Sequence, residues 1–274
     1  MDAAARADVA LVFATQFTSE NMDLPSLSLP DNAADPANQA YDQNALIAAV
    51  AARNKATVVV LENGTAVTMP WLNSVPSVLT AWYPGVRGGE AIADVLFGDV
   101  NPSGKLPLTF PRREQNLPQP VIPATNTTIT YAEGLNMGYR WFDAKGIEPH
   151  FPFGHGLSYT SFSYSGLTVT KAANGDLTVR VPLKNDGARA GAEVAQVYAT
   201  LPPAAQEPPK RLVAWQKVSL KAGDARQLTI TVPNRRLNIW NAVTRHTQTL
   251  PGNYTLRVGG SSRSPTMLQT AVAL

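Results

Sequence analysis

Hydrophobic residues repeat with two different periods in the two halves of this 274-residue chain. In the first half, short continuous apolar runs alternate with segments whose apolar residues recur at helical spacing. In the second half, apolar and polar residues alternate one by one over successive short segments. A segment whose apolar residues recur every two residues cannot bury them on one face of a helix, and a segment with helical spacing cannot bury them on one face of a strand. The chain is therefore predicted to contain two structurally different parts.

The first half predicts a mostly parallel sheet covered by helices. The predicted strands are residues 9–13, 57–61 and 77–80. One predicted helix ends near Asn54, and another spans residues 88–97 with Gly98 as its stop. Strands that alternate with helices indicate βαβ units, and continuous apolar strands indicate burial on both faces. Because three strands are few for an open α/β sheet, this half is predicted to be an incomplete α/β sandwich.

The second half predicts an antiparallel β-sandwich. Period-two alternation occurs in residues 177–183, 228–232 and 254–258. Turn signals such as Asn174-Gly175 and Pro251-Gly252 separate the alternating segments.

A stretch rich in Pro, Gly and aromatic residues, about residues 99–160, joins the two halves. Its many aromatic side chains indicate a connector that packs against a neighbouring surface rather than a flexible linker. The predicted domains are therefore residues 1–160, which include this connector, and residues 161–274.

Composition excludes several classes of protein. The chain has no cysteine, which excludes disulfide frameworks, thiol nucleophiles and thiolate zinc sites. It has three histidines, so a multi-histidine metal centre is not expected, and no cofactor is predicted. No apolar run reaches the roughly 18 residues of a membrane-spanning helix, and the N-terminus does not resemble a signal peptide. The compartment is left open.

Charge is distributed unevenly between the two halves. Residues 1–161 hold 9 Lys and Arg and 15 Asp and Glu, whereas residues 162–274 hold 14 and 5. The basic residues of the second half are scattered and accompany no nucleic-acid recognition motif, so no nucleic-acid partner is expected. The asymmetry instead supports two domains with different surfaces.

Three glutamates are candidates for chemistry. Glu20 lies in the loop directly after the first predicted strand, Glu62 ends the second strand, and Glu133 lies in a connector loop. Loops at the carboxyl ends of parallel strands form the ligand sites of open α/β sheets. A glutamate held there partly out of water can donate a proton near neutrality. From spacing alone, solvated or helix-capping roles remain the alternatives.

Two other motifs favour structural roles. Residues 85–89, with three glycines before a helix, match no phosphate-binding pattern and indicate a tight turn. His150 and His155 are spaced poorly for a shared metal, so packing or hydrogen bonding is expected of them.

An ordered series of short motifs runs through the whole chain. In the first domain the series comprises Ser19-Glu20, Leu24-Pro-Ser-Leu-Ser-Leu-Pro30, Ala81-Trp-Tyr-Pro-Gly85, Gly88-Gly-Glu-Ala91, Asn101-Pro-Ser-Gly-Lys-Leu-Pro107, Tyr131-Ala-Glu-Gly134 and Phe151-Pro-Phe-Gly-His-Gly-Leu-Ser-Tyr159. In the second it comprises Val194-Ala-Gln-Val-Tyr198, Lys210-Arg-Leu212, Gln216-Lys-Val218 and Pro251-Gly-Asn-Tyr254. The set closely resembles the C-terminal part of the β-glucosidases of glycoside hydrolase family 3: a truncated α/β sandwich domain, then a fibronectin type III-like domain.

The resemblance implies a retaining glycosidase that works with two carboxylates. The family's acid/base glutamate usually lies in a stretch resembling S-E-G-x-D-R, which residues 19–24 match. Glu20 therefore inherits the acid/base role, and Asp23 has a candidate supporting role. Asn21 and Leu24 depart from the family's glycine and arginine, which puts the backbone shape of the loop and one arginine contact in doubt.

The resemblance also implies what the chain lacks. In the family the nucleophilic aspartate lies on an N-terminal barrel domain, and no carboxylate here matches its motif. We therefore expect little or no glycosidase activity from this chain alone, with a separate barrel domain as a candidate partner. The implied substrates are β-linked gluco-oligosaccharides or aryl and alkyl glycosides. Family members are often periplasmic or secreted.

Two further expectations complete the sequence-based prediction. A non-catalytic carbohydrate-binding or assembly module is the alternative to the enzyme. A truncated sheet would expose an unpaired edge and an apolar face, which predicts self-association. No membrane partner is expected.

Overall fold

A computed structural model describes residues 2–20, 24–30, 42–120 and 128–274. The chain divides into two compact units. The first, here called the α/β unit, comprises Met1–Asp99 and Phe110–Pro120, and the second, here called the β-sandwich unit, comprises Val100–Thr109 and Val121–Leu274. The predicted fold class is confirmed, because a parallel sheet with helices is followed by antiparallel sheets. The predicted domain boundary at residue 160 stays a prediction.

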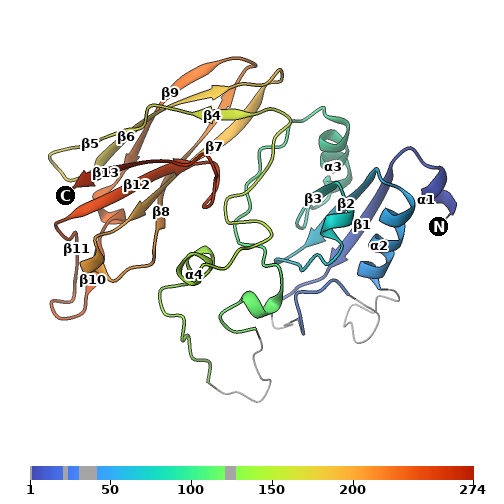
Figure 1. The fold of residues 1–274 in the computed structure, drawn as a ribbon, viewed down its shortest axis with the longest axis horizontal. Coiled ribbons are helices and arrows are strands. Elements are labelled where there is room, and N and C mark those ends of the chain that lie inside the picture. Colours follow the sequence, from blue (N-terminus) through green and yellow to red (C-terminus); the bar gives the residue numbers. More distant parts are fainter. Residues whose placement is uncertain (1, 21–23, 31–41, 121–127) are drawn as a thin grey trace. The chain divides into compact units, whose positions relative to one another are not determined.

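Among the residues that the structure describes, the α/β unit forms a sheet of three parallel strands in the order β1-β2-β3 (Figure 1). The strands are β1 (Ala10–Gln16), β2 (Thr57–Asn63) and β3 (Ser77–Thr80). The helices are α1 (Asp2–Arg6), α2 (Gln43–Arg53) and α3 (Gly88–Phe97), with short 3-10 helices at Leu72–Ser74 and Glu114–Asn116. All three predicted strands and both predicted helices are present, whereas the short α1 was not predicted.

Side-chain caps explain where the helices begin and end. The carboxylate of Asp42 accepts a hydrogen bond from the Ala45 N–H at 2.9 Å, which starts α2. Asn54 is the C-cap residue of α2. Its side-chain amide donates a hydrogen bond to the Ala7 carbonyl at 2.8 Å, which connects the end of the helix to the segment before β1. Gly98 ends α3 with a φ of 83°, a left-handed conformation that glycine adopts at little cost.

Strand β1 is buried on one face only, which corrects the prediction of a fully buried strand. Residues on the covered face are buried, but Leu11 and Phe13 remain 47% and 48% exposed. By contrast, Val59, Val60 and Leu61 in the central strand β2 have no exposed area. The cause is what covers the strand: α2 packs against one face of β1, and the face that carries Leu11 and Phe13 is left exposed.

The side chain of Gln43 hydrogen-bonds to the backbone of β1. Its Oε1 accepts from the Thr15 N–H at 2.8 Å, and its Nε2 donates to the Thr15 carbonyl at 2.8 Å. Gln43 is fully buried at the first position of α2, so one amide satisfies both peptide groups of Thr15. This pair of bonds fixes the start of α2 against the end of β1.

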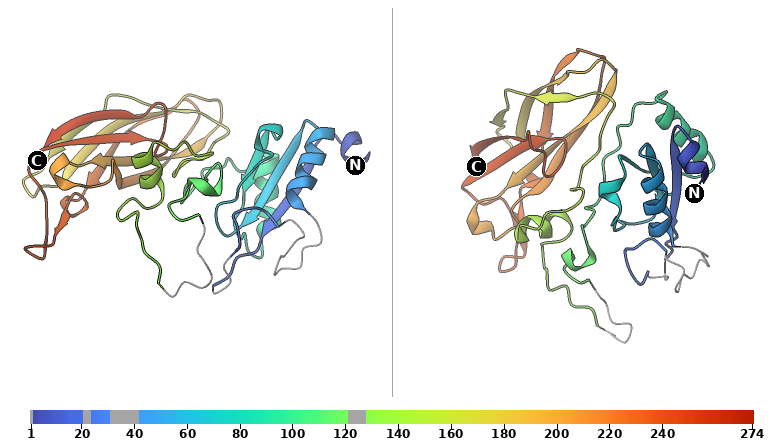
Figure 2. Two further views of the ribbon diagram at one scale, coloured as in Figure 1. Left: turned by 60° about the horizontal axis from the view of Figure 1, so that its bottom comes forward. Right: turned by 45° about the vertical axis from the view of Figure 1, so that its right-hand side comes forward.

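The β-sandwich unit has two main antiparallel sheets, seen as two layers in Figure 2. One sheet has the order β13-β12-β7-β8, and in the other β6 pairs with β4, β5 and β9. The strands are β4 (Phe162–Tyr164), β5 (Thr168–Lys171), β6 (Leu177–Asn185), β7 (Gly191–Thr200), β8 (Arg211–Leu220), β9 (Ala225–Val232), β12 (Asn253–Gly259) and β13 (Leu268–Ala273). A small hairpin is formed by β10 (Ile239–Asn241) and β11 (His246–Gln248).

The period-two patterns of the sequence identify the core of this unit. The alternating apolar residues of β6, β9 and β12 lie in one buried cluster with those of β7 and β8. In β12 the buried Tyr254 donates its hydroxyl to the Leu250 carbonyl at 2.8 Å. A tyrosine bonded to the backbone a few residues upstream also stabilises immunoglobulin-like sandwiches.

The latter part of the connector packs against strands of the β-sandwich unit. It contains an unpredicted helix, α4 (Tyr139–Lys145), and the ring of Tyr139 stacks on Phe153 at 4.9 Å between centroids. The Tyr139 hydroxyl accepts a hydrogen bond from the Leu212 N–H of β8 at 2.7 Å. In β7, Gln196 donates to the Gly154 carbonyl at 3.1 Å. These contacts make the latter part of the connector a part of the sandwich's surface layer.

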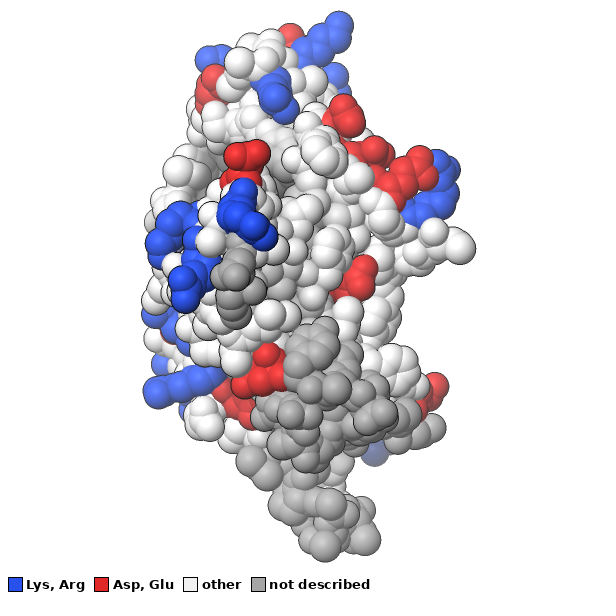
Figure 3. Space-filling model, turned by 90° about the vertical axis from the view of Figure 1, so that its right-hand side faces the viewer, with Lys and Arg blue, Asp and Glu red and all other residues white. Residues whose placement is uncertain are grey.

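Charged side chains of both signs are interspersed over the face of the molecule drawn in Figure 3. Within the segments that the structure describes, no helix combines the length and the apolar character needed to cross a bilayer.

Candidate active site

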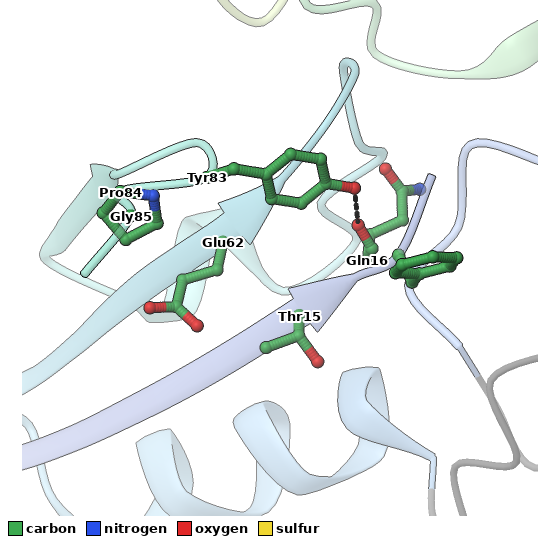
Figure 4. A pocket seen from close by; sticks show the side chains of 7 residues that line it. Thr15, Gln16, Glu62, Tyr83, Pro84 and Gly85 are labelled. Atoms are coloured by element: carbon green, nitrogen blue, oxygen red, sulfur yellow. Dashed lines mark hydrogen bonds between the residues drawn. The ribbon is translucent and has the colours of Figure 1, made fainter. Parts of the chain in front are cut away.

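A hollow of about 380 Å³ lies where the strands of the α/β unit end (Figure 4). It is lined by Thr15, Gln16, Phe17, Glu62, Tyr83, Pro84 and Gly85. These residues come from the carboxyl ends of β1 and β2 and from the loop after β3. The hollow thus occupies the edge of the sheet at which open α/β folds form their ligand sites.

Glu62 supplies the hollow with a carboxylate. It is half-buried near the end of β2, beside Thr15 of β1 in the parallel register. Figure 4 shows both side chains on the same side of the sheet. Of the three candidate glutamates, Glu62 is the one that the structure places in the lining of the hollow.

Tyr83 lies across the end of β1. Its hydroxyl donates to the Gln16 carbonyl at 3.0 Å, shown by the dashed line in Figure 4. The same oxygen accepts a hydrogen bond from the Thr18 N–H at 2.6 Å. The loop after β3 therefore holds the segment that leaves β1 toward Glu20.

Glu20 lies in an exposed turn, four residues after the end of β1. It is not among the residues lining the hollow, although Phe17 of the same loop is. Asp23 lies outside the described residues, and its predicted supporting role stays a prediction. The structure thus places Glu20 in a loop at the carboxyl end of the sheet, as expected.

Glu133 belongs to the β-sandwich unit rather than to the α/β unit. One of its carboxylate oxygens, Oε2, is buried without a hydrogen-bond partner among the described residues. Glu62 and Glu133 therefore belong to different units.

The two motifs expected to be structural have structural surroundings. Gly85 has a φ of 71°, and its carbonyl accepts from the Gly88 N–H at 3.1 Å, which makes the predicted tight turn before α3. The ring of His155 stacks on Phe151 at 5.1 Å between centroids. Burial, followed by the charge of Lys105, lowers the pKa of His155. In the described part of the chain, acidic and histidine side chains form no group suited to a metal ion.

Sequence reasoning missed the part that Tyr83 plays at this site. Thr18 and Tyr83 are 65 residues apart, and no periodicity connects them. The available signal was the position of Tyr83 just after a predicted strand, at the same edge of the sheet as Glu20.

Family models match both parts of the chain. Residues 1–159 match the glycosyl hydrolase family 3 C-terminal domain, and residues 193–262 match the fibronectin type III-like domain. A thermostable β-glucosidase B from Acetivibrio thermocellus is 42% identical over 269 residues, which cover 95% of this chain and 34% of the relative. A β-glucosidase from Rhizobium radiobacter is 38% identical over 96% of this chain and 32% of the relative. The chain therefore spans about a third of the length of these curated relatives.

Solved structures agree with the family models. The chain is similar to DesR, a β-glucosidase from Streptomyces venezuelae solved with D-glucose, with a TM-score of 0.91 and 43% identity. That match covers 100% of this chain and 34% of DesR. A family 3 β-glucosidase from Bifidobacterium adolescentis gives a TM-score of 0.89 at 35% identity, and the match covers 99% of this chain and 40% of the Bifidobacterium chain. These matches, with the parallel sheet and the β-sandwich, show that the chain belongs to glycosyl hydrolase family 3 and corresponds to the C-terminal portion of its β-glucosidases.

Proposed function

We propose that this chain is the acid/base-bearing portion of a retaining β-glucosidase-like hydrolase, with Glu20 as the acid/base residue. The observation that carries the proposal is the place of Glu20, in the loop after β1 of a family 3 domain. The hollow at the same edge of the sheet, lined in part by that loop, supports it. The nucleophilic aspartate would be supplied by a barrel domain outside these 274 residues.

The proposed reaction divides the work between two carboxylates. The aspartate of the barrel attacks the anomeric carbon while protonated Glu20 donates its proton to the departing glycosidic oxygen. This step leaves a covalent glycosyl-enzyme and a Glu20 carboxylate. That carboxylate then removes a proton from water, whose oxygen attacks the anomeric carbon and releases the sugar. The proposed substrates are β-linked gluco-oligosaccharides and aryl or alkyl β-glucosides.

The experiment compares the purified chain alone with the chain mixed with a barrel domain from a family 3 β-glucosidase. We expect little or no hydrolysis of an aryl β-glucoside by the chain alone, because one carboxylate of the pair is absent. With the barrel present, Glu20→Gln should lower turnover by about 10²–10⁴-fold, the usual contribution of general acid–base catalysis. The loss of kcat/KM, which reports the first step, should be larger for an alkyl glucoside than for a dinitrophenyl glucoside, since dinitrophenolate departs without a proton.

A matched control is Glu90→Gln, which changes an exposed glutamate paired with Arg87 in α3. It should leave turnover unchanged. Robust hydrolysis by the chain alone, abolished by Glu20→Gln, would refute the division of the two carboxylates between the chain and a barrel. Binding of a β-glucoside without turnover, both by the chain alone and in the mixture, would favour the alternative function, a non-catalytic carbohydrate-binding or assembly module.

We also propose that the chain self-associates through β1 when no other polypeptide covers it. Val9, directly before β1, and Leu11 and Phe13 within it expose about half of their area on one face of this edge strand. Exposed apolar faces and strand edges favour association. Light scattering should detect a dimer or larger oligomer that Phe13→Lys dissociates, whereas a monodisperse wild-type monomer would refute the proposal.

A further inference from the structure

The hydroxyl of Tyr83 uses its full hydrogen-bonding capacity on the segment that leads to Glu20. It lies 2.6 Å from the Thr18 nitrogen and 2.7 Å from Thr18 Oγ1. It also lies 3.0 Å from the Gln16 carbonyl oxygen. A phenol has one proton and two acceptor sites. It can therefore accept from both groups of Thr18 while donating to Gln16, which leaves no hydrogen-bonding capacity unused.

The backbone before Tyr83 is held in a strained conformation. Trp82 has a φ of 55°, a left-handed value that is rare for a bulky residue. Its ring packs against Phe110 within the α/β unit, with 6.1 Å between centroids. Strained residues of this kind persist where their surroundings fix them, and they are frequent at functional sites. Here the anchored Trp82 precedes the tyrosine that reaches back to β1.

A third loop, the one after β2, closes against the same hydroxyl groups. A Cβ atom placed on Gly64 would lie 1.7 Å from Thr18 Oγ1 and 2.8 Å from the Tyr83 hydroxyl. Only glycine fits there without displacing Thr18. The loops after β1, β2 and β3 therefore meet at one point, where Thr18, Gly64 and Tyr83 are in contact. Thr18 lies two residues before Glu20 in the chain.

We infer that Tyr83 is a positioning residue for Glu20. It fixes residues 16–18, the stem of the Glu20 loop, to the end of the sheet, so that the carboxyl group is presented in a restricted set of orientations. General acid catalysis depends on such placement, because proton transfer requires hydrogen-bond reach between the acid and the departing oxygen. This inference rests on the proposed role of Glu20.

The first test measures the loop itself in the 274-residue chain. Amide hydrogen exchange and ¹⁵N relaxation by NMR are compared between the wild type and Tyr83→Phe. Loss of the hydroxyl and its three hydrogen bonds should speed exchange of the Thr18 amide about tenfold, because bonds that are largely exposed to water stabilise the closed state only weakly. The amides of Ser19 and Glu20 should lose order on the nanosecond timescale, whereas the β-sandwich unit should be unchanged.

Matched variants separate the hydrogen bonds from a general loss of packing. Thr18→Ser keeps the hydroxyl and should retain the wild-type exchange rate at position 18, whereas Thr18→Val should raise it. Tyr131→Phe removes an exposed phenol from the β-sandwich unit and should change nothing at the Glu20 loop. Unchanged exchange and order in Tyr83→Phe would overturn the inference.

The second test separates this inference from the proposed function. In the mixture of chain and barrel, Tyr83→Phe should lower kcat/KM for an alkyl glucoside more than kcat/KM for a dinitrophenyl glucoside. Equal losses on both substrates would indicate a structural role and overturn the inference. If Glu20→Gln itself shows no dependence on the leaving group, the proposed function fails, while the exchange result still decides whether Tyr83 holds the loop.

Discussion

The buried carboxylate of Asp143 should make a large contribution to the stability of the β-sandwich unit. It lies in α4, is 7% exposed, and accepts from Lys210 at 2.6 Å and Arg263 at 3.1 Å. Asp143→Asn keeps the shape of the side chain but leaves Lys210 without its counter-charge and Arg263 with only the surface carboxylate of Glu148. Breaking a buried ion pair in this way costs about 3–5 kcal/mol. We expect about 3 kcal/mol, since the amide oxygen still accepts one hydrogen bond.

Glu148 provides a matched control, because it pairs with the same arginine at the surface. Its carboxylate lies 2.7 Å from Arg263 but is 65% exposed. A solvated ion pair contributes about 1 kcal/mol or less, so Glu148→Gln should be nearly neutral. The two variants thus change one charge each next to Arg263 and differ in burial and in the additional pair of Asp143 with Lys210.

Urea unfolding monitored by circular dichroism measures the difference. Asp143→Asn should lower the unfolding midpoint without changing the denaturant slope, because the native surface stays the same. In thermal unfolding, about 3 kcal/mol corresponds to roughly 6–12 °C for a unit of this size. Equal losses for Asp143→Asn and Glu148→Gln, or a loss below about 1 kcal/mol for the former, would refute the argument from burial.

Three further predictions concern pH, a cap and a core hydroxyl. Because the folded chain lowers the pKa of His155, the unfolded state binds its proton first, so stability should fall as pH drops below about 6.5. His155→Gln should weaken the dependence of stability on pH, whereas His246→Gln, at an exposed position, should leave it unchanged. Unfolding midpoints measured between pH 8 and 5 would show the difference. Gly98→Ala should destabilise the α/β unit by about 1 kcal/mol in urea titrations, because the left-handed backbone that ends α3 disfavours a side chain. Tyr254→Phe should cost the β-sandwich unit about 1 kcal/mol by the same assay, since the half-buried Leu250 carbonyl loses its donor; a neutral result would show that water replaces the hydroxyl.

Local patterns predicted the elements of the fold because they depend on short-range chemistry. Alternation in residues 177–183 places every second side chain in the sandwich core, and Gly98 ends α3 where the helical pattern stops. The burial of β1 could not be predicted in the same way. A continuous apolar run shows that both faces can be buried, but what covers each face depends on the elements around it.

The candidate site could be predicted only in part, for a similar reason. Glu20 could be selected as a candidate from the sequence, because it follows a predicted strand and lies in a stretch that resembles the family motif. The hydrogen bonds of Tyr83 to residues 16–18 join segments 65 residues apart, and only the folded chain brings them together. The seven-residue helix α4 was hidden by the aromatic, Gly- and Pro-rich composition of the connector.

The amide of Gln43 limits how another strand could extend the sheet beyond β1. The Ala10 N–H donates to the Ala56 carbonyl, directly before β2. The N–H and C=O groups of successive residues in a strand point to opposite edges. Those of Leu11, Phe13 and Thr15 therefore point to the outer edge, away from β2. Gln43 already occupies both groups of Thr15. An incoming strand could therefore form a ladder only alongside the first part of β1, ending at Phe13. The side chain of Gln43 in α2 therefore restricts the register in which any other polypeptide can pair with the outer edge of β1.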